Sequence, residues 1–278
     1  AKEGYKVICL NNSNKESFVN GVLYAPNKLV DSYKFKCKNL IIHRYSEIPK
    51  IAHKKAFMWA TDLNGVHNLK FYKLFEEKKL TLITLSNFHN DLFPKSWDKH
   101  VIYFMIPDWV YEYSIPENKK DYIYASSLMK GYSSTLPLWK YLKNEKLLSK
   151  TDVLNVCLPG YDNPTQDISE KDYGINYLGT LKFKEVIELM AKCRGMFYVN
   201  TMPETFGISV VLADILKTTP FVYGINGLGS LSELINNKNL TTDMQEYINM
   251  FKTYSSLNET PRNFRPKMVI KWWKKVLI

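Results

Sequence analysis

The chain has 278 residues, which is too long for one small domain and suits two domains of about 100–150 residues each. Hydrophobic residues make up 45% of the chain and charged residues 23%, which excludes a disordered or fibrous protein. The 38 lysines and arginines against 27 aspartates and glutamates give a net charge of +11. This excess fits an anionic substrate, a nucleic acid, an anionic membrane surface or a plain bias toward lysine, and does not choose among them.

Signals for membrane insertion, secretion and metal binding are absent from the sequence. The longest apolar runs, at residues 7–10 and 208–211, are far shorter than the roughly 20 residues of a membrane helix. The amino-terminal residues lack the sections of a secretory signal, so we expect a cytoplasmic protein without a transmembrane segment; peripheral membrane contact stays open. The four cysteines and five histidines are scattered. Reduced core thiols are therefore expected over disulfides or a zinc site, which needs closely paired ligands.

Short apolar segments that end in polar turns make up the first half of the chain. We expect strands at residues 5–10, 39–42, 56–60, 80–85 and 101–106, separated by helical or loop segments. Strands alternating with helix-length connections predict βαβ units and a parallel sheet covered on both faces. Ligands of such sheets bind outside the carboxyl ends of the strands. Polar residues 11–14 and 61–65, which follow two of these strands, are therefore expected to face a cleft.

A linker-like segment separates this half from a second alternating series. Apolar periodicity vanishes over residues 113–121, where Pro, Asn and Lys accumulate. We therefore predict one domain at 1–118, a second at 119–260, and a C-terminal helix at 261–278 that can pack back on the first. Strands are expected at 122–124, 153–158, 175–178, 196–199 and 221–223, and helices at 130–143, 184–192, 206–216, 231–235, 242–255 and 265–278. The sequence thus predicts an α/β protein with two Rossmann-like, doubly wound parallel-sheet domains facing a cleft.

The most informative stretch, residues 202–214, combines a strand end, a glycine-containing turn and an apolar helix. Exposed amides and the positive dipole end at a helix N-terminus favour an anion. The amides of Phe206, Gly207 and Ile208 are candidate donors to that anion, and the Glu204 carboxylate is a candidate acceptor for hydroxyl groups. An acidic residue in a first helical turn is also common as an ordinary cap, and this alternative stays open.

Residues 125–131 repeat the pattern of strand, polar turn and helix. Lys130 can reach a phosphate there as a point charge and stabilise a leaving group. A surface lysine that starts a helix is the simpler alternative. As a bare pattern, this segment does not decide between them.

Several segments in a fixed order carry a resemblance to a known family. They are Trp59-Ala-Thr-Asp62, Leu85-Ser-Asn-Phe-His-Asn-Asp-Leu-Phe93, Tyr124-Ala-Ser-Ser-Leu-Met-Lys-Gly131, Leu136-Pro-Leu-Trp139, Asn176-Tyr-Leu-Gly-Thr180, Glu185-Val-Ile-Glu-Leu-Met-Ala191 and Pro203-Glu-Thr-Phe-Gly207. In order and spacing, over about residues 57–236, they resemble the "group 1" GT-B glycosyltransferases. The resemblance implies a GT-B-type fold and an enzyme that moves a sugar from a nucleotide-diphosphate donor to a glycan acceptor hydroxyl. It also implies that no metal or other cofactor is needed.

The resemblance implies a role for particular residues. Lys130 would contact the donor diphosphate and Glu204 the donor sugar. The wider donor-binding set comprises Ser126, Ser127, Gly160, Leu178, Thr180, Thr205, Phe206, Gly207 and Ile208. Asp62 is the candidate on the acceptor side, as a general base in an inverting reaction or as an acceptor-positioning residue in a retaining one. Capping of the next helix or turn is the structural alternative for Asp62.

The chain departs from the family pattern at three places. A second glutamate, which the family places near the ribose eight positions after the first, is Leu212 here. Asp214 lies about 200° further around a helix and is no simple replacement. The family's acceptor-side histidine corresponds to Thr61, and a glycine-rich first loop is replaced by residues 11–14. Ribose recognition and stereochemistry therefore stay open.

Two further expectations concern origin and competing functions. The compact size and the lysine- and asparagine-rich composition are similar to glycosyltransferases encoded by large DNA viruses of algae, which implies action in host cytoplasm on a virion glycan. The alternatives to sugar transfer are a noncatalytic nucleotide or nucleic-acid binding protein, and a phosphorylase or epimerase on the same scaffold. No nucleic-acid partner is expected, because the basic residues are spread out and no nucleic-acid-binding motif occurs.

Overall fold

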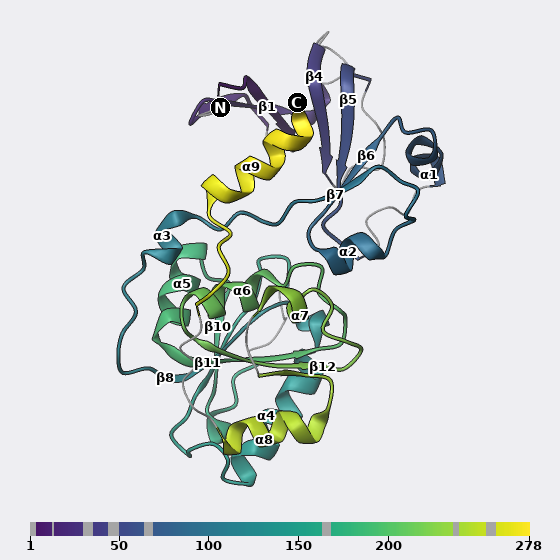
Figure 1. Cartoon of the computed structure of the whole chain (residues 1–278). Helices are drawn as coiled ribbons and strands as arrows, with labels where there is room; N and C mark the ends of the chain where they lie inside the picture. Colours follow the sequence, from purple (N-terminus) through teal and green to yellow (C-terminus); the bar gives the residue numbers. More distant parts are fainter. Residues whose placement is uncertain are drawn as a thin grey trace. The chain divides into compact units, whose positions relative to one another are not determined.

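The computed structural model describes residues 4–12, 14–29, 36–43, 50–63, 69–162, 168–235, 239–253 and 260–278. The chain divides into two compact units (Figure 1). Unit 1 comprises residues 1–83, 94–100 and 277, and unit 2 comprises residues 84–93, 101–276 and 278. The domain boundaries at 118 and 260 and the cleft between domains stay predictions.

Unit 2 is built on a six-stranded parallel sheet in the order β10-β9-β8-β11-β12-β13. Its strands are β8 (Lys120–Ala125), β9 (Leu154–Cys157), β10 (Ile175–Gly179), β11 (Cys193–Asn200), β12 (Thr219–Gly224) and β13 (Leu240–Thr241). Numbered within the unit, this order is 3-2-1-4-5-6, as in Rossmann sheets. The direction of winding reverses between β8 and β11, and ligands bind at such a switch point.

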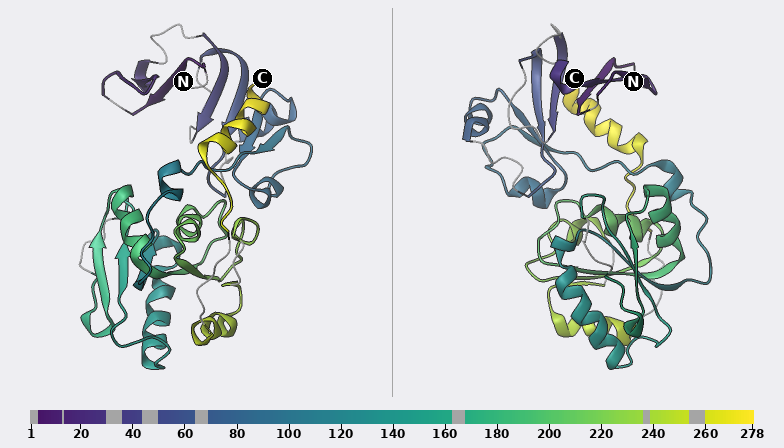
Figure 2. Two further views of the ribbon diagram at one scale, coloured as in Figure 1. Left: turned by 60° about the vertical axis from the view of Figure 1, so that its left-hand side comes forward. Right: turned by 180° about the vertical axis from the view of Figure 1, so that it is seen from behind.

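Helices cover both faces of this sheet (Figure 2). Helices α4 (Tyr132–Asn144) and α8 (Met244–Lys252) lie on one face, and α5 (Phe183–Lys192) and α6 (Ile208–Ile215) on the other. The shorter helices of the unit are α2 (Asn87–Asp91), α3 (Asp108–Tyr111) and α7 (Leu231–Leu234), and α9 (Pro266–Leu277) ends the chain. The predicted doubly wound α/β arrangement is therefore confirmed for this unit.

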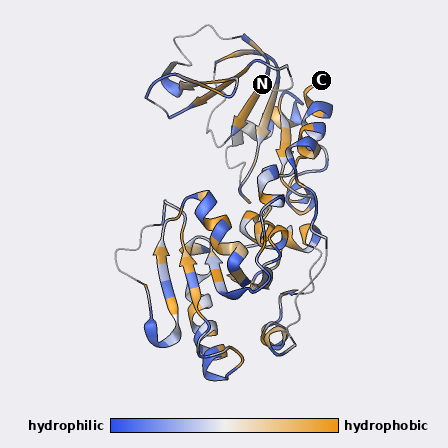
Figure 3. Cartoon of the chain, turned by 90° about the vertical axis from the view of Figure 1, so that its left-hand side faces the viewer, coloured by the Kyte–Doolittle hydropathy of each residue, from blue (hydrophilic) through white to orange (hydrophobic). Residues whose placement is uncertain are grey.

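The core of unit 2 explains why these segments form strands. Every residue of β11 except Arg194 is buried, as expected of a central strand covered on both faces. In Figure 3 the strands of this sheet carry orange, apolar segments interspersed with polar ones. Beneath the α4 and α8 face, the rings of Phe221 and Phe251 stack at 4.4 Å and Phe197 meets Tyr247 edge-on at 5.7 Å. Full burial of each ring contributes roughly 1.5–3 kcal/mol, so this face fixes the positions of β8, β11 and β12.

Unit 1 contains a four-stranded sheet in the order β4-β5-β6-β7. These strands are β4 (Lys36–His43), β5 (Ala52–Trp59), β6 (Thr81–Thr84) and β7 (Lys99–Val101), and helix α1 (Leu69–Glu76) connects β5 to β6. The pairs β4–β5 and β5–β6 are parallel, as predicted. Strand β7 is shorter than the predicted 101–106, and residues 102–106 run on without regular structure.

A separate three-stranded sheet holds the first predicted strand. Strand β1 (Val7–Asn11) pairs in parallel with β3 (Val22–Pro26), which pairs antiparallel with β2 (Ser17–Val19). The expectation of one sheet for the whole first half was therefore wrong: Asn11 ends a strand of this sheet, whereas residue 61 follows β5 of the other one. The missed signal was Asn20-Gly21 between two apolar runs: both residues have positive φ, 51° and 80°, as a tight hairpin turn requires.

Predicted element positions agree elsewhere to within a few residues. The helix expected at 242–255 runs over Met244–Lys252, and residues 254–255 lie outside the described ranges, as do residue 13 and residues 64–65 of the two polar loops. In the described ranges no helix has the length and apolar character needed to cross a bilayer.

Candidate functional site

Two residues predicted for the site meet at the switch point of the six-stranded sheet. Lys130 ends a short 3-10 helix (Leu128–Lys130) just after β8, and Glu204 lies between β11 and α6. The Lys130 Nζ donates to Glu204 Oε1 at 2.8 Å, although the residues are 74 positions apart. The parallel order that puts β8 beside β11 thus brings a cation and a carboxylate together at the carboxyl edge of the sheet.

Close backbone contact fixes the position of Lys130. The next residue, Gly131, has φ 122°, and a Cβ on it would lie 2.4 Å from the carbonyl oxygen of Val199 on β11. Only glycine tolerates both conditions. The amide of Thr201 donates to the Lys130 carbonyl at 3.2 Å, and the Tyr124 hydroxyl donates to the Ser127 carbonyl at 2.7 Å. The turn after β8 is therefore tied to β11 on one side and to β8 itself on the other.

A second glycine contact fixes Glu204, whose residue surface is only 5% exposed. The amide of Ser230 donates to the Glu204 carbonyl at 2.8 Å, and Glu204 forms an isolated parallel bridge with Gly229. Gly229 has φ 62°, and a Cβ there would lie 2.4 Å from the Glu204 carbonyl oxygen. The loop before α7 thus clamps the turn that carries the carboxylate.

Hydrogen bonds offset the cost of burying the negative charge of Glu204. Its Oε1 accepts from Lys130, from the Tyr198 hydroxyl and, at 3.5 Å, from Asn200 Nδ2. Burial and the neighbouring Glu204 carboxylate raise the pKa of Tyr198 well above its ordinary value, so this phenol stays a donor. Sequence reasoning missed Tyr198 and Asn200. Their signal was two polar side chains two residues apart, hence on one face, at the end of an otherwise apolar strand.

The start of helix α6 borders this carboxylate. Its N-cap, Gly207, is in the left-handed conformation with φ 67°, and a Cβ there would lie 2.4 Å from Leu231 on α7 and 3.4 Å from Glu204 Cβ. The Val210 and Val211 amides donate to the Gly207 carbonyl at 3.0 and 3.1 Å, so the amides of Ile208 and Ser209 are the ones that precede the helical hydrogen bonds, and Ile208 is exposed. Thr205 is buried, and the ring of Phe206 packs in the core at 5.4 Å from Phe104. Phe206 can therefore offer a ligand its backbone only.

The other predicted donor-side residues lie along the same edge of the sheet. Ser126 is half-buried directly after β8, between the buried residues Ala125 and Ser127. Gly160 follows β9 and Thr180 follows β10; both are exposed, and a Cβ on Gly160 would lie 3.6 Å from Thr180 Cγ2. Leu178 is half-buried within β10. The whole predicted set, with Ser127 and Lys130, thus occupies the carboxyl edge from β10 to β11.

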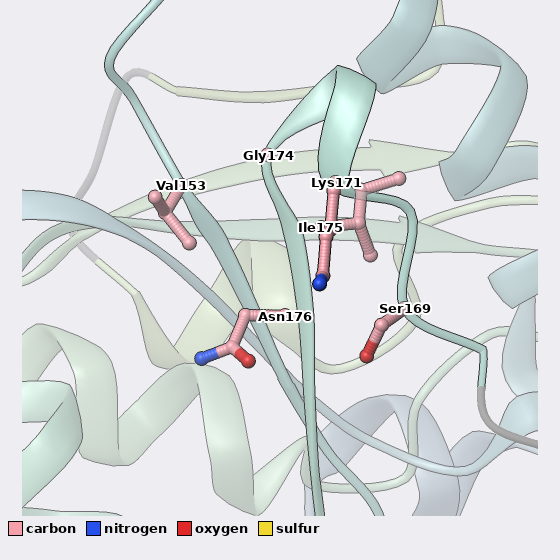
Figure 4. A pocket seen from close by; sticks show the side chains of 6 residues that line it. All are labelled: Val153, Ser169, Lys171, Gly174, Ile175 and Asn176. Carbon is pink, nitrogen blue, oxygen red and sulfur yellow. The ribbon is translucent and has the colours of Figure 1, made fainter.

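A cavity of about 370 Å³ lies at the opposite, amino edge of this sheet (Figure 4). It is lined by Val153, Ser169, Lys171, Gly174, Ile175 and Asn176, from the starts of β9 and β10 and the segment before β10. Ser169 Oγ accepts from the Tyr177 amide at 3.0 Å, and Asn176 Nδ2 donates to Asn155 at 3.2 Å. Because doubly wound sheets bind ligands at their carboxyl edge, we do not count this cavity as part of the candidate site.

Polar groups also follow the strands of unit 1. Asp62 is exposed after β5, seven residues before α1 begins, so it is not the N-cap of that helix. Thr61 is buried, and its Oγ1 lies 3.3 Å from Nε2 of His43 at the end of β4. The His43 ring packs at 5.1 Å from Trp59. No sequence motif pointed to His43; strand register places it opposite Trp59, two residues before Thr61.

One departure from the family pattern, Leu212, can be placed in the structure together with the nearby acid Asp214. Leu212 is buried in α6, while Asp214 on the same helix is half-buried.

Within the described ranges, no three His, Cys, Asp or Glu side chains come together as a metal site would require.

Comparisons with known proteins were made at three levels. No protein-family model matches the sequence, and no curated protein matches it. Among solved structures, TarM is similar with a TM-score of 0.61 and 12% identity over 96% of this chain and 62% of TarM. WaaG, a glycosyltransferase involved in lipopolysaccharide biosynthesis, gives 0.54 and 14% over 99% of this chain and 83% of WaaG. Anabaena HepE, solved with UDP and glucose, gives 0.52 and 16% over 72% of this chain and 61% of HepE.

These likenesses establish the fold. At 12–16% identity the chain shares the mixed α/β, parallel-sheet architecture of GT-B glycosyltransferase structures, and it spans about 62% of the length of TarM. The predicted GT-B fold is thereby confirmed. The names of these structures lend no support to the expected viral origin.

Proposed function

We propose that this chain is a glycosyltransferase that moves a sugar from a nucleoside-diphosphate donor to a hydroxyl group of a glycan acceptor. The observation that carries the proposal is the Lys130–Glu204 pair, which lies beside the N-terminus of α6 at the switch point of a Rossmann sheet. A cation and free helix amides suit a diphosphate, and a carboxylate suits sugar hydroxyls. WaaG and HepE, which share the fold, are respectively named a glycosyltransferase and solved with UDP and glucose.

The proposed donor chemistry is electrostatic. As the bond between sugar and diphosphate breaks, negative charge grows on the departing phosphate. Lys130, whose side chain is 40% exposed, and the first-turn amides of α6 would stabilise that charge. Glu204 would accept hydrogen bonds from donor-sugar hydroxyls and so orient the sugar.

The proposed acceptor chemistry belongs to unit 1. Asp62 is exposed at the carboxyl edge of its sheet, with His43 and Thr61 nearby on the same edge. In an inverting reaction Asp62 would take the proton of the acceptor hydroxyl; in a retaining one it would position that hydroxyl. The anomeric configuration of the product, read by NMR, distinguishes the two.

We also propose that transfer needs no metal ion. The sequence contains no Asp-x-Asp pair, and Lys130 with the α6 amides can supply the positive charge that a metal would otherwise provide. Activity should therefore persist in excess EDTA. Complete loss in EDTA that manganese or magnesium restores would contradict this proposal.

A reducing, cytoplasmic location fits the state of the cysteines. All four, Cys9, Cys37, Cys157 and Cys193, are free thiols. Free thiols persist in reducing compartments, whereas secreted proteins tend to pair theirs.

The direct test of the proposed function is a thermal-shift panel followed by product analysis. UDP-glucose, UDP-galactose, UDP-N-acetylglucosamine and GDP-mannose are each added to the whole chain. A donor present at 100 times its Kd stabilises the folded state by about 2.7 kcal/mol. The proposal is supported if one of them stabilises the chain saturably and its sugar is hydrolysed or is transferred to an added glycan.

The same panel includes the competing function. Stabilisation by oligonucleotides that weakens steeply with salt, with none from any nucleotide sugar, would favour a nucleic-acid binding protein and would overturn sugar transfer.

A further inference from the structure

The two carboxylate oxygens of Glu204 have different surroundings. Oε1 accepts from three donors, namely Lys130 Nζ, the Tyr198 hydroxyl and Asn200 Nδ2. In the described part of the chain, no hydrogen bond reaches Oε2. A carboxylate oxygen has room for about two hydrogen bonds, so Oε1 is fully used. Oε2 is then the oxygen left for a ligand.

One of the three donors has a second task in the proposed reaction. Lys130 is 40% exposed on its side chain and is the group proposed to meet the donor diphosphate. Glu204, by contrast, is only 6% exposed on its side chain. A buried carboxylate that loses its cation is costly unless other donors remain. The site therefore needs neutral donors that keep their hydrogen bonds to Oε1 when Lys130 binds the donor diphosphate instead.

Tyr198 has the properties of such a donor. It is 2% exposed, its phenol bonds directly to Oε1, and burial together with the Glu204 carboxylate keeps its pKa well above the ordinary value. It lies on β11, the central strand, which is buried on both faces and cannot shift easily. Asn200, two residues further on the same face, adds a weaker bond.

We infer that Tyr198 is a positioning residue: its phenol anchors Oε1 of Glu204, so that Oε2 alone accepts a hydrogen bond from a hydroxyl of the donor sugar. The inference rests on the proposed function and deepens it. It makes the ligand class a nucleotide sugar with a free hydroxyl facing Oε2. It also separates two tasks, because Lys130 recognises the diphosphate while Tyr198 acts on the sugar through Glu204.

Two other ionisable groups of unit 2, Tyr124 and Glu233, do not duplicate the role of Tyr198. Tyr124 is close enough to feel the Glu204 charge, but its hydroxyl donates to the Ser127 carbonyl. Glu233 on α7 accepts from Asn87 Nδ2 at 2.9 Å and from the Phe88 amide at 3.3 Å. The carboxylate of α7 thus bonds to α2 rather than to the donor site.

The test compares two affinities of Tyr198→Phe, which removes one oxygen and keeps the ring. Titration calorimetry measures the Kd of the best nucleotide sugar from the panel and that of its nucleoside diphosphate alone. Without the phenol, Glu204 is no longer held in place, and the hydrogen bond from the sugar hydroxyl to Oε2 is weakened. A hydrogen bond to a charged group contributes about tenfold or more to affinity. We expect the variant to bind the nucleotide sugar at least tenfold more weakly and the nucleoside diphosphate within twofold of the unaltered chain. Equal losses for both ligands, or no loss for either, would overturn the inference.

Tyr247→Phe is the matched control. Tyr247 is also fully buried in unit 2, but its hydroxyl lies 3.5 Å from the Phe221 carbonyl, away from Glu204. A general effect of deleting a buried phenol would lower the melting temperature in both variants and leave the ratio of the two affinities unchanged in both. The proposed role of Tyr198 predicts that the ratio changes in Tyr198→Phe and stays the same in Tyr247→Phe.

A double-variant cycle checks that Tyr198 acts through Glu204. In a Glu204→Gln background, Tyr198→Phe should cause no further selective loss of nucleotide-sugar affinity. A further tenfold selective loss in that background would show that Tyr198 acts independently and would overturn the inference. If the unaltered chain binds no nucleotide sugar of the panel, the proposed function fails as well. If it binds one and Tyr198→Phe keeps the ratio, only the positioning role fails.

Discussion

The carboxyl edges of the two main sheets are built differently. In unit 2, Glu204 is 5% exposed and its carboxylate accepts hydrogen bonds from three side chains, and Gly131 and Gly229 allow backbone contacts no larger residue would permit. In unit 1, Asp62 is exposed, and Oγ1 of the preceding Thr61 lies 3.3 Å from Nε2 of His43. A prearranged edge suits a ligand part that never varies, such as a diphosphate and its sugar. An exposed edge suits partners met from solvent.

The largest expected effect tests the exposed edge. Asp62→Asn keeps the shape of the side chain and removes its negative charge. If Asp62 is the general base, transfer should fall by about 10²–10⁴-fold with nearly constant melting temperature and donor affinity. Transfer rates with saturating donor and acceptor measure this. A lowered melting temperature with normal turnover of the folded fraction would instead make Asp62 structural.

A smaller loss is expected at the prearranged edge. Lys130→Ala removes charge stabilisation from the departing diphosphate, so transfer should fall by more than about tenfold while the fold persists. Lys130→Arg, which keeps the charge, should retain more activity than Lys130→Ala. Steady-state rates and circular dichroism measure both. Near-normal turnover of Lys130→Ala would contradict the proposed role.

The clamp on Glu204 can be tested by stability alone. Gly229→Ala forces a non-glycine residue to a positive φ and places its Cβ 2.4 Å from the Glu204 carbonyl oxygen. We expect a destabilisation of about 2–4 kcal/mol from strain plus overpacking. Gly179→Ala is the matched control, because Gly179 has a similar φ of 68° with nothing within 4 Å of its Cβ. It should cost about 1–2 kcal/mol in urea unfolding; equal losses would show that Gly229 exerts no clamp.

The smallest expected effect compares the thiols of the two units. Burial raises the pKa of Cys157 and Cys193 in unit 2 to about 12, so their reactive thiolate forms are rare at neutral pH. In unit 1, Cys9 and Cys37 are half-buried. Ellman's reagent should therefore label two thiols of the native chain at least about tenfold faster than the other two. Uniform labelling of all four would remove this contrast between the units.

Sequence patterns predicted the elements of unit 2 well because each has a strong local cause. The apolar strands end in polar turns, and glycine and helix signals follow them. The position of Lys130 and Glu204 on one sheet edge also follows from strand–turn–helix order. Their direct contact does not, because it depends on which strands become neighbours.

The remaining site residues could not be read locally. Tyr198 lies in a run of buried residues and reads as core until the carboxylate beside it is known. His43 has no motif and gains its place only from the register of β4 with β5. Phe206 was predicted to offer its backbone amide, which stays a prediction; that its ring belongs to an aromatic cluster with Phe104 and Phe264 depends on the tertiary fold and could not be read locally.

The strand order of unit 2 also has a consequence for how the protein folds. Strands β8 and β9, and β9 and β10, are close in sequence and can pair early. Strands β8 and β11 are separated by residues 126–192, so their pairing requires this long segment to close into a loop. Contacts between such distant segments form slowly, because the chain loses the entropy of closing a long loop before these contacts stabilise it. The bond between Lys130 and Glu204 spans 74 positions across this junction. During refolding, the proposed donor site should therefore be among the last parts to form, after most secondary structure is already in place.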